Sequence, residues 1–325
     1  MIETDSWSSV ADRRSDKRYP CENAAMPPDV RSWFDLPQLL DTGERRMPLV
    51  LVNGLAEQPE SWYASRVSLS RHFELKVPEI LVYDGEALHR HLQSGGEVTV
   101  DYLAERLAVY LDEFVQRPPY HLVGSSLGGQ VVLTYADRHP EKVARTVLLA
   151  PSGFHGRENL PVLEGVRRSN ADTLIRSVFF HGHHASDELV EAFRARFQDR
   201  RWKLGVIRTL RGTIGHSVAP LLPRVSVPTL IIWGAEDRIL SDVPGSIRAA
   251  ERIPAVRQVV IPRCGHAPQI EKARLVNRLI SLYLRDRLRA IPAGLDPRRY
   301  LEQVETPVGR GGPLAVSPKI FIGRA

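Results

Sequence analysis

Short apolar runs alternate with amphipathic stretches along most of this chain, and that alternation limits its fold more than any other feature. The amphipathic stretches are typical of helices, as in Thr99–Gln116, where Thr99 is an expected N-cap. Strands that alternate with helices predict βαβ units. We therefore expect an α/β fold with a mostly parallel central sheet flanked by helices. The apolar runs read as buried strands are Met47–Gly54, Pro78–Gly85, His121–Gly124, Val143–Gly153, Val227–Asp237 and Val256–His266.

One long stretch, residues 155–223, interrupts the alternation. It is rich in arginine, has helical spacing and contains no strand-like run, so we predict an inserted helical lid. The lid would divide the core into residues 46–154 and 224–290. Residues 1–45 are polar and poorly periodic, which predicts a partly flexible N-terminal arm. Residues 291–325 are rich in proline and glycine and are expected to form a loose or disordered C-terminal extension.

The most informative motif is Gly124-Ser125-Ser126-Leu127-Gly128, which matches G-x-S-x-G between a predicted strand and a predicted helix. A sharp strand-to-helix turn needs small neighbours, and Gly124 and Gly128 provide them. It exposes the central residue, Ser126, beside the positive end of the helix dipole. The glycines could alternatively serve only to pack a tight turn. The motif in this context makes Ser126 the candidate nucleophile.

A serine nucleophile needs a general base, and the base needs an orienting carboxylate. Asp237 and His266 each follow an apolar strand directly, and the order Ser, Asp, His along the chain is that of one known class of triad. Alternatives remain open at each position. Asp237 could cap a turn or helix, neighbouring Glu236 could take its place, and His266 could be an ordinary loop histidine.

Stabilisation of an oxyanion requires two N–H donors near the nucleophile. The backbone of Leu127, the residue after Ser126, is one candidate. The second is the backbone of Leu55, in the loop that follows the first strand. Asn53-Gly54 in that loop could instead be no more than a turn.

Residues from about 47 to 290 resemble the α/β-hydrolase fold superfamily, in particular lidded serine hydrolases related to carboxylesterases and to meta-cleavage-product carbon–carbon hydrolases. The resemblance implies a core sheet of about eight strands, an inserted lid and no cofactor for the chemistry. The segments that carry it are LVLVNGLAEQPESW, LVGSSLGGQVVLTYADRHPEKV, VPTLIIWGAEDRIL and VIPRCGHAPQIEKARLVNRLI.

The sequence also departs from the family pattern. Asn53-Gly54 stands where His-Gly is usual, and Ala267 stands where the carbon–carbon hydrolases carry tryptophan. These departures favour a serine esterase that cleaves a small-molecule ester. Carbon–carbon cleavage of a vinylogous diketone, acyl transfer and non-catalytic ligand binding are the alternatives.

Composition restricts the partners. The net charge of +6 comes from scattered residues, with no basic run interleaved with aromatics, so we expect a small-molecule substrate and no nucleic acid. No long apolar segment or secretory signal is evident, which predicts a cytoplasmic protein without a membrane partner. His181, His183 and His184 cluster in the lid near Asp187 and Glu188, but no further ligand set accompanies them, and no metal is predicted. A homo-oligomer is left open.

Overall fold

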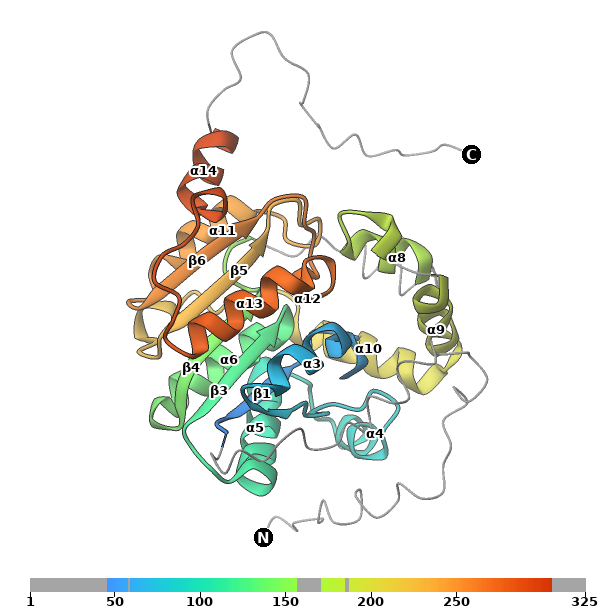
Figure 1. Ribbon diagram of the computed structural model, residues 1–325. Helices are drawn as coiled ribbons and strands as arrows, with labels where there is room; N and C mark the ends of the chain where they lie inside the picture. Colours follow the sequence, from blue (N-terminus) through green and yellow to red (C-terminus); the bar gives the residue numbers. More distant parts are fainter. Residues whose placement is uncertain (1–45, 58, 157–170, 185–186, 306–325) are drawn as a thin grey trace, which may run out of the picture.

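Six parallel strands form the centre of the protein, as the computed structural model in Figure 1 shows. The structure describes residues 46–57, 59–156, 171–184 and 187–305. The strand order across the sheet is β2-β1-β3-β4-β5-β6, and every adjacent pair is parallel. The predicted α/β class is therefore confirmed. The strands are β1 (Pro48–Val52), β2 (Glu74–Lys76), β3 (Tyr120–Ser125), β4 (Val143–Leu149), β5 (Thr229–Gly234) and β6 (Val256–Ile261).

Apolar side chains from the strands point alternately to the two faces of the sheet, and helices cover both faces (Figure 1). In β1, for example, Val50 and Val52 join one core cluster, whereas Leu49 and Leu51 join the other. Helices α5 (Val100–Tyr110), α6 (Leu127–Arg138) and α11 (Val243–Ala250) contribute to the first cluster. Helices α3 (Tyr63–Ser70) and α13 (Ala273–Leu284) contribute to the second. Burial on both faces explains why the strands read as continuous apolar runs.

The strand order reverses between β1 and β3, because the chain passes from β1 outward to β2 and then returns to the other side of β1. Ligands of open parallel sheets bind beyond the carboxyl ends of the strands at such a reversal. The loop after β1 and the turn after β3 meet at this point. It is the region that contains Leu55 and Ser126.

Three α-helices occupy the described part of the predicted lid, which agrees with its helical pattern. They are α8 (Ala171–Val178), α9 (Asp187–Gln198) and α10 (Arg200–Thr213), and they lie beside one end of the sheet rather than on its faces (Figure 1). No strand occurs in the lid residues that the structure describes. Residues 157–170 and 185–186 of the predicted lid lie outside the described chain.

Two expectations were wrong. Residues 78–85 form no strand; the edge strand is β2, Glu74–Lys76, and it stops just before Pro78, which lacks the N–H that a longer ladder would need. A described part of the C-terminal extension, Pro297–Glu305, is a helix, α14. It is anchored because the Tyr300 hydroxyl donates a hydrogen bond to the Ala235 carbonyl at 3.2 Å.

Other expectations are met only in part or lie beyond the described residues. The sequence pattern predicts one last helix over roughly residues 268–289, and the structure divides it into α12 (Pro268–Glu271) and α13, with Lys272 between them. The sheet has six strands within the described residues, against the eight that the resemblance implied. The predicted N-terminal arm, residues 1–45, and residues 306–325 of the predicted C-terminal extension are outside the described chain.

Candidate active site

Ser126 lies at the sharp turn between β3 and α6, with φ 49° and ψ −116°, a backbone conformation that is strained for a residue with a side chain. The turn is tight enough to exclude larger neighbours. A Cβ atom on Gly124 would come within 2.4 Å of the Gly128 carbonyl oxygen, and one on Gly128 within 2.5 Å of the Val52 carbonyl oxygen. The second contact also shows that the turn packs directly against the end of β1.

Ser126, His266 and Asp237 form a continuous chain of hydrogen bonds. The Ser126 hydroxyl lies 2.8 Å from Nε2 of His266, and Nδ1 of His266 lies 2.7 Å from Oδ2 of Asp237. The Asp237 side chain is fully buried, and that of His266 is 8% exposed. A carboxylate offers only acceptors, so Nδ1 carries the ring proton, and Nε2 is left to accept the serine proton.

The rival position, Glu236, has a different partner. Its Oε2 accepts the backbone N–H of Cys264 at 3.1 Å. Asp237 is in turn held by the N–H groups of Ile239 and Leu240, which donate to its Oδ1 at 2.8 and 3.1 Å. This arrangement leaves the other oxygen of Asp237 for His266 and fixes the direction in which it points.

The loop that contains His266 is joined to the lid. The His266 N–H donates to the Val178 carbonyl at the end of α8, at 2.8 Å. Glu271 accepts the N–H of Gly265 at 2.7 Å and that of Phe180 at 2.9 Å, one on each oxygen. Burial raises the pKa of Glu271, although these hydrogen bonds act in the opposite direction. The lid therefore contributes to the position of the histidine.

The loop after β1 contains the candidate donor Leu55 and is held on both sides of it. The Gly54 N–H donates to Oε2 of Glu57 at 2.9 Å, and the Ala56 N–H donates to the Tyr83 hydroxyl at 2.9 Å. Asn53, which replaces the usual histidine, accepts the indole N–H of Trp62 at 2.8 Å. The other candidate donor, Leu127, is the first residue of α6. Both therefore lie at the carboxyl ends of adjacent strands.

Four residues around the site were not predicted from the sequence, namely Glu57, Tyr83, Gln269 and Glu271. Glu57 stands two residues after Leu55, and Glu271 stands five residues after His266. Proximity to a predicted site residue is the only signal for either carboxyl group. Tyr83 belongs to the segment 78–85, which was predicted to be a strand. That prediction gave no reason to expect its contact with the loop after β1.

The lid histidines do not assemble a metal site within the described residues. No group of three or more histidine, cysteine, aspartate or glutamate side chains there is placed to hold an ion. The rings of His181 and His184 have centroids 6.3 Å apart, and Phe180 and Phe179 respectively lie beside them. The side chains of His183 and Glu188 are outside the described part.

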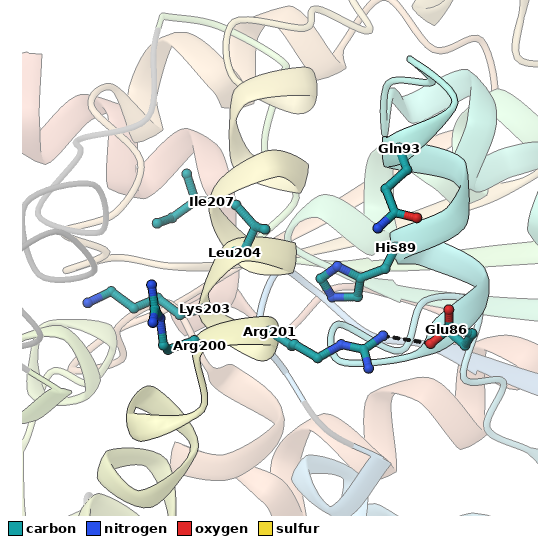
Figure 2. A pocket seen from close by; sticks show the side chains of 8 residues that line it. All are labelled: Glu86, His89, Gln93, Arg200, Arg201, Lys203, Leu204 and Ile207. Carbon is teal, nitrogen blue, oxygen red and sulfur yellow. Dashed lines mark hydrogen bonds and ion pairs between the residues drawn. The ribbon is translucent and has the colours of Figure 1, made fainter.

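An open cleft of about 710 Å³ lies between α4 (Glu86–Gln93) and α10 (Figure 2). Arg201 extends from α10 across this cleft to Glu86, with 2.8 Å between the guanidinium and the carboxylate. The cleft contains none of the candidate catalytic residues. Its ion pair instead joins the outer side of the lid to the core, while Trp202 on the same helix packs against Tyr83 with ring centroids 5.8 Å apart.

A model of the alpha/beta hydrolase family matches residues 49–279. The chain belongs to the alpha/beta hydrolase family. It is 23% identical to Lipase 3 of Moraxella sp. (strain TA144) over 248 residues, which cover 72% of this chain and 75% of the lipase. The family model and the homologous lipases identify it as an α/β-fold hydrolase.

Solved structures agree on the fold of this alpha/beta hydrolase. Carboxylesterase CesB from Bacillus subtilis superposes with a TM-score of 0.65 at 19% identity, covering 74% of this chain and 84% of that enzyme. A meta-cleavage product hydrolase from Pseudomonas fluorescens IP01 superposes with a TM-score of 0.61 at 20% identity, covering 74% and 91%. Both relations are those that the sequence resemblance predicted. None of the helices in the described residues is both long and apolar enough to span a membrane.

Proposed function

We propose that this alpha/beta hydrolase cleaves a small-molecule carboxylic ester, with Ser126 as nucleophile, His266 as general base and acid, and Asp237 as the group that orients His266. The observation that carries this proposal is the unbroken hydrogen-bond chain from Ser126 through His266 to buried Asp237. The same roles are required wherever a serine hydroxyl attacks an acyl carbon.

In the acylation step, Ser126 Oγ attacks the ester carbonyl carbon while its proton moves to Nε2 of His266. The carbonyl oxygen becomes an oxyanion, which accepts hydrogen bonds from the backbone N–H groups of Leu55 and Leu127. Asp237 stabilises the imidazolium that forms. The tetrahedral intermediate then collapses, the ester C–O bond breaks, and His266 returns its proton to the leaving alcohol. An acyl-enzyme on Ser126 remains.

Deacylation repeats these steps with water. His266 takes a proton from the water molecule, which attacks the acyl carbon, and the oxyanion forms again between the same two N–H groups. When this second intermediate collapses, the proton passes from His266 to Ser126 Oγ. The carboxylic acid leaves, and the hydrogen-bonded serine is restored.

The side chains above the site support an apolar ester. Phe179 and Ile175 of the lid pack against Ala267, which adjoins His266, and Phe193 links this cluster to the one around Trp202. These apolar surroundings beside His266 favour an uncharged acyl chain over a substrate that bears carboxylates, and so they favour the ester over a dienoate.

The test is active-site labelling combined with a substrate panel. A fluorophosphonate should label the wild type at Ser126, and p-nitrophenyl butyrate should be hydrolysed. Ser126→Ala should abolish labelling, and His266→Ala should slow it greatly. Wild-type protein that is neither labelled nor active on short p-nitrophenyl esters would contradict the proposal. Cleavage of a dienone-diacid by protein that leaves esters intact would instead assign carbon–carbon hydrolysis.

A further inference from the structure

Glu57 lies in the loop after β1, and its carboxyl group is hydrogen-bonded both within that loop and to the strand that leads to Ser126. Its Oε2 accepts a hydrogen bond from the Gly54 N–H at 2.9 Å, and its Oε1 accepts one from the Ser125 hydroxyl at 2.8 Å. Ser125 is fully buried and in turn accepts a hydrogen bond from Nε2 of Gln269 at 3.2 Å. Gln269 stands three residues after His266. The Glu57 carboxyl group is thus connected to all three segments of the site.

The contact with Gly54 bears directly on the proposed oxyanion donor. Leu55 is the next residue, and on its other side the Ala56 N–H is held by Tyr83. Ala56 has φ 59°, so the backbone turns sharply there. Peptide planes adjacent to a donor determine where its N–H points. A donor stabilises an oxyanion only when it is aimed before the charge develops, because reorientation during the reaction costs free energy.

We propose that Glu57 is a positioning residue for the oxyanion hole: by holding Gly54 against Ser125, it aims the Leu55 N–H at the oxyanion that forms on the substrate. This inference rests on the proposed serine-hydrolase function. Glu57 does not touch the reacting atoms in the scheme. It acts through the backbone of the loop, and its role is to maintain the distance between that loop and Ser126.

The test separates a positioning role from a role of charge by comparing Glu57→Leu with Glu57→Gln. The leucine side chain cannot accept the Gly54 N–H. The glutamine carboxamide can accept it through oxygen while its NH₂ group donates to Ser125. We expect kcat per active site to fall about 100-fold in Glu57→Leu, with KM changed less than about threefold, as for loss of an oxyanion donor. Glu57→Gln should stay within about tenfold of the wild type.

Inhibition by phenylboronic acid distinguishes a positioning role from a merely structural one, because loss of stability alone would leave the inhibition constant unchanged. The boron of phenylboronic acid adds to the serine oxygen, and the tetrahedral adduct places an oxygen where the oxyanion forms. Its inhibition constant should rise in Glu57→Leu by about the same factor as kcat falls. Glu105→Leu, at an exposed position of α5, is the matched control and should retain the wild-type inhibition constant. Counting active sites with the fluorophosphonate ensures that a lower kcat is not caused by unfolded protein in the sample.

Several outcomes would overturn the inference. Wild-type kcat and phenylboronate inhibition in Glu57→Leu would do so, as would a lower melting temperature with unchanged activity per labelled site. Should Glu57→Leu fail to fold, Glu57→Gln still decides the question. A 100-fold loss of kcat in Glu57→Gln means that the charge of the side chain matters and its positioning role does not. If the wild type itself is not labelled, the proposed function has failed, and the Glu57 comparison is not reached.

Discussion

Two buried histidines lie at opposite ends of the central sheet, and they differ in what surrounds their rings. His266 follows β6 at the carboxyl end, and its two ring nitrogens face Asp237 and Ser126. His121 is in β3 near the amino end, 5% exposed, and its Nδ1 has no hydrogen-bond partner among the described residues. Burial is therefore common to both. His266 is distinguished by a partner on each ring nitrogen, as its proposed role in proton transfer requires.

The two rings also differ in their electrostatic surroundings. Asp237 faces His266, and a carboxylate stabilises an imidazolium. His121 instead lies opposite Arg145 of β4, and its ring forms a T-shaped contact with that of Phe73, with 5.7 Å between the ring centroids. Burial, together with the Arg145 cation, lowers the pKa of His121 to about 4. One environment supports the charged form of the ring, and the other opposes it.

The largest predicted effect removes the carboxylate that orients His266. In Asp237→Asn the retained oxygen still accepts the N–H groups of Ile239 and Leu240, which turns the NH₂ group toward Nδ1. His266 must then accept at Nδ1 and carry its proton on Nε2, where it cannot take the proton of Ser126. We expect kcat to fall about 10⁴-fold with little change in melting temperature.

The control for this variant is Glu236→Gln, whose carboxamide oxygen can still accept the Cys264 N–H. Its rate should stay within about threefold of the wild type. Initial rates with p-nitrophenyl butyrate, measured on protein shown by its unfolding transition to be folded, compare the two variants. Equal losses in both, or a nearly active Asp237→Asn, would show that His266 is oriented by something other than Asp237.

The part of the site that could be predicted from the sequence is the part that depends on local pattern. Ser126, Asp237 and His266 each follow an apolar run, and in a parallel sheet the carboxyl ends of the strands gather at one edge. The apolar periodicity, together with the residue types at the strand ends, therefore predicted that these three residues lie close together. The G-x-S-x-G spacing added the turn, because Gly124 and Gly128 are required by contacts within a few residues or with the adjacent strand.

The remainder depends on contacts between distant segments. Glu57 and Glu271 are charged residues, which a sequence reading places in solvent, and their partners Ser125 and Phe180 are 68 and 91 positions away. The apolar run at residues 78–85 reads as a strand, yet Tyr83 is buried against the lid residue Trp202 and not in the sheet. A local pattern shows that a segment is apolar but not which distant surface covers it.

The second prediction concerns stability and the other histidine. Between pH 6.5 and about 4 the unfolded chain binds a proton at His121, whereas the folded chain does not. The stability that neutral His121 contributes is fully present above pH 6.5, falls as the pH is lowered through this window, and levels off below it. The loss amounts to about 3 kcal/mol in the free energy of unfolding.

Urea unfolding of the wild type and of His121→Phe across this pH range measures that contribution as the difference between the two curves. The difference should change by about 3 kcal/mol between pH 7 and pH 4, while kcat per active site stays at the wild-type value. His72→Phe is the comparison: partial burial and neighbouring arginines also lower the pKa of that exposed ring, so the substitution should remove some of the pH dependence and leave most of it in place. A wild-type-minus-variant difference that does not vary with pH would contradict the prediction.

The smallest predicted effect tests whether the turn that holds Ser126 against His266 is as tightly packed as its contacts indicate. In Gly128→Ala the new methyl group would lie 2.5 Å from the Val52 carbonyl oxygen and 2.6 Å from that of Asn53. Both are backbone atoms, so relieving the contact requires a shift of the main chain. We expect the free energy of unfolding to fall by about 1–3 kcal/mol, together with a lower kcat, because relief of the clash displaces Ser126 from Nε2 of His266.

Gly182→Ala in the lid is the control. It adds the same methyl group where no atom lies within 4 Å, so its stability should stay within about 0.5 kcal/mol of the wild type. Thermal and urea unfolding of the pair, with rates per labelled site, make the measurement. Equal stabilities for the two variants would mean that the turn can relax, and that Ser126 owes its place beside His266 to other contacts.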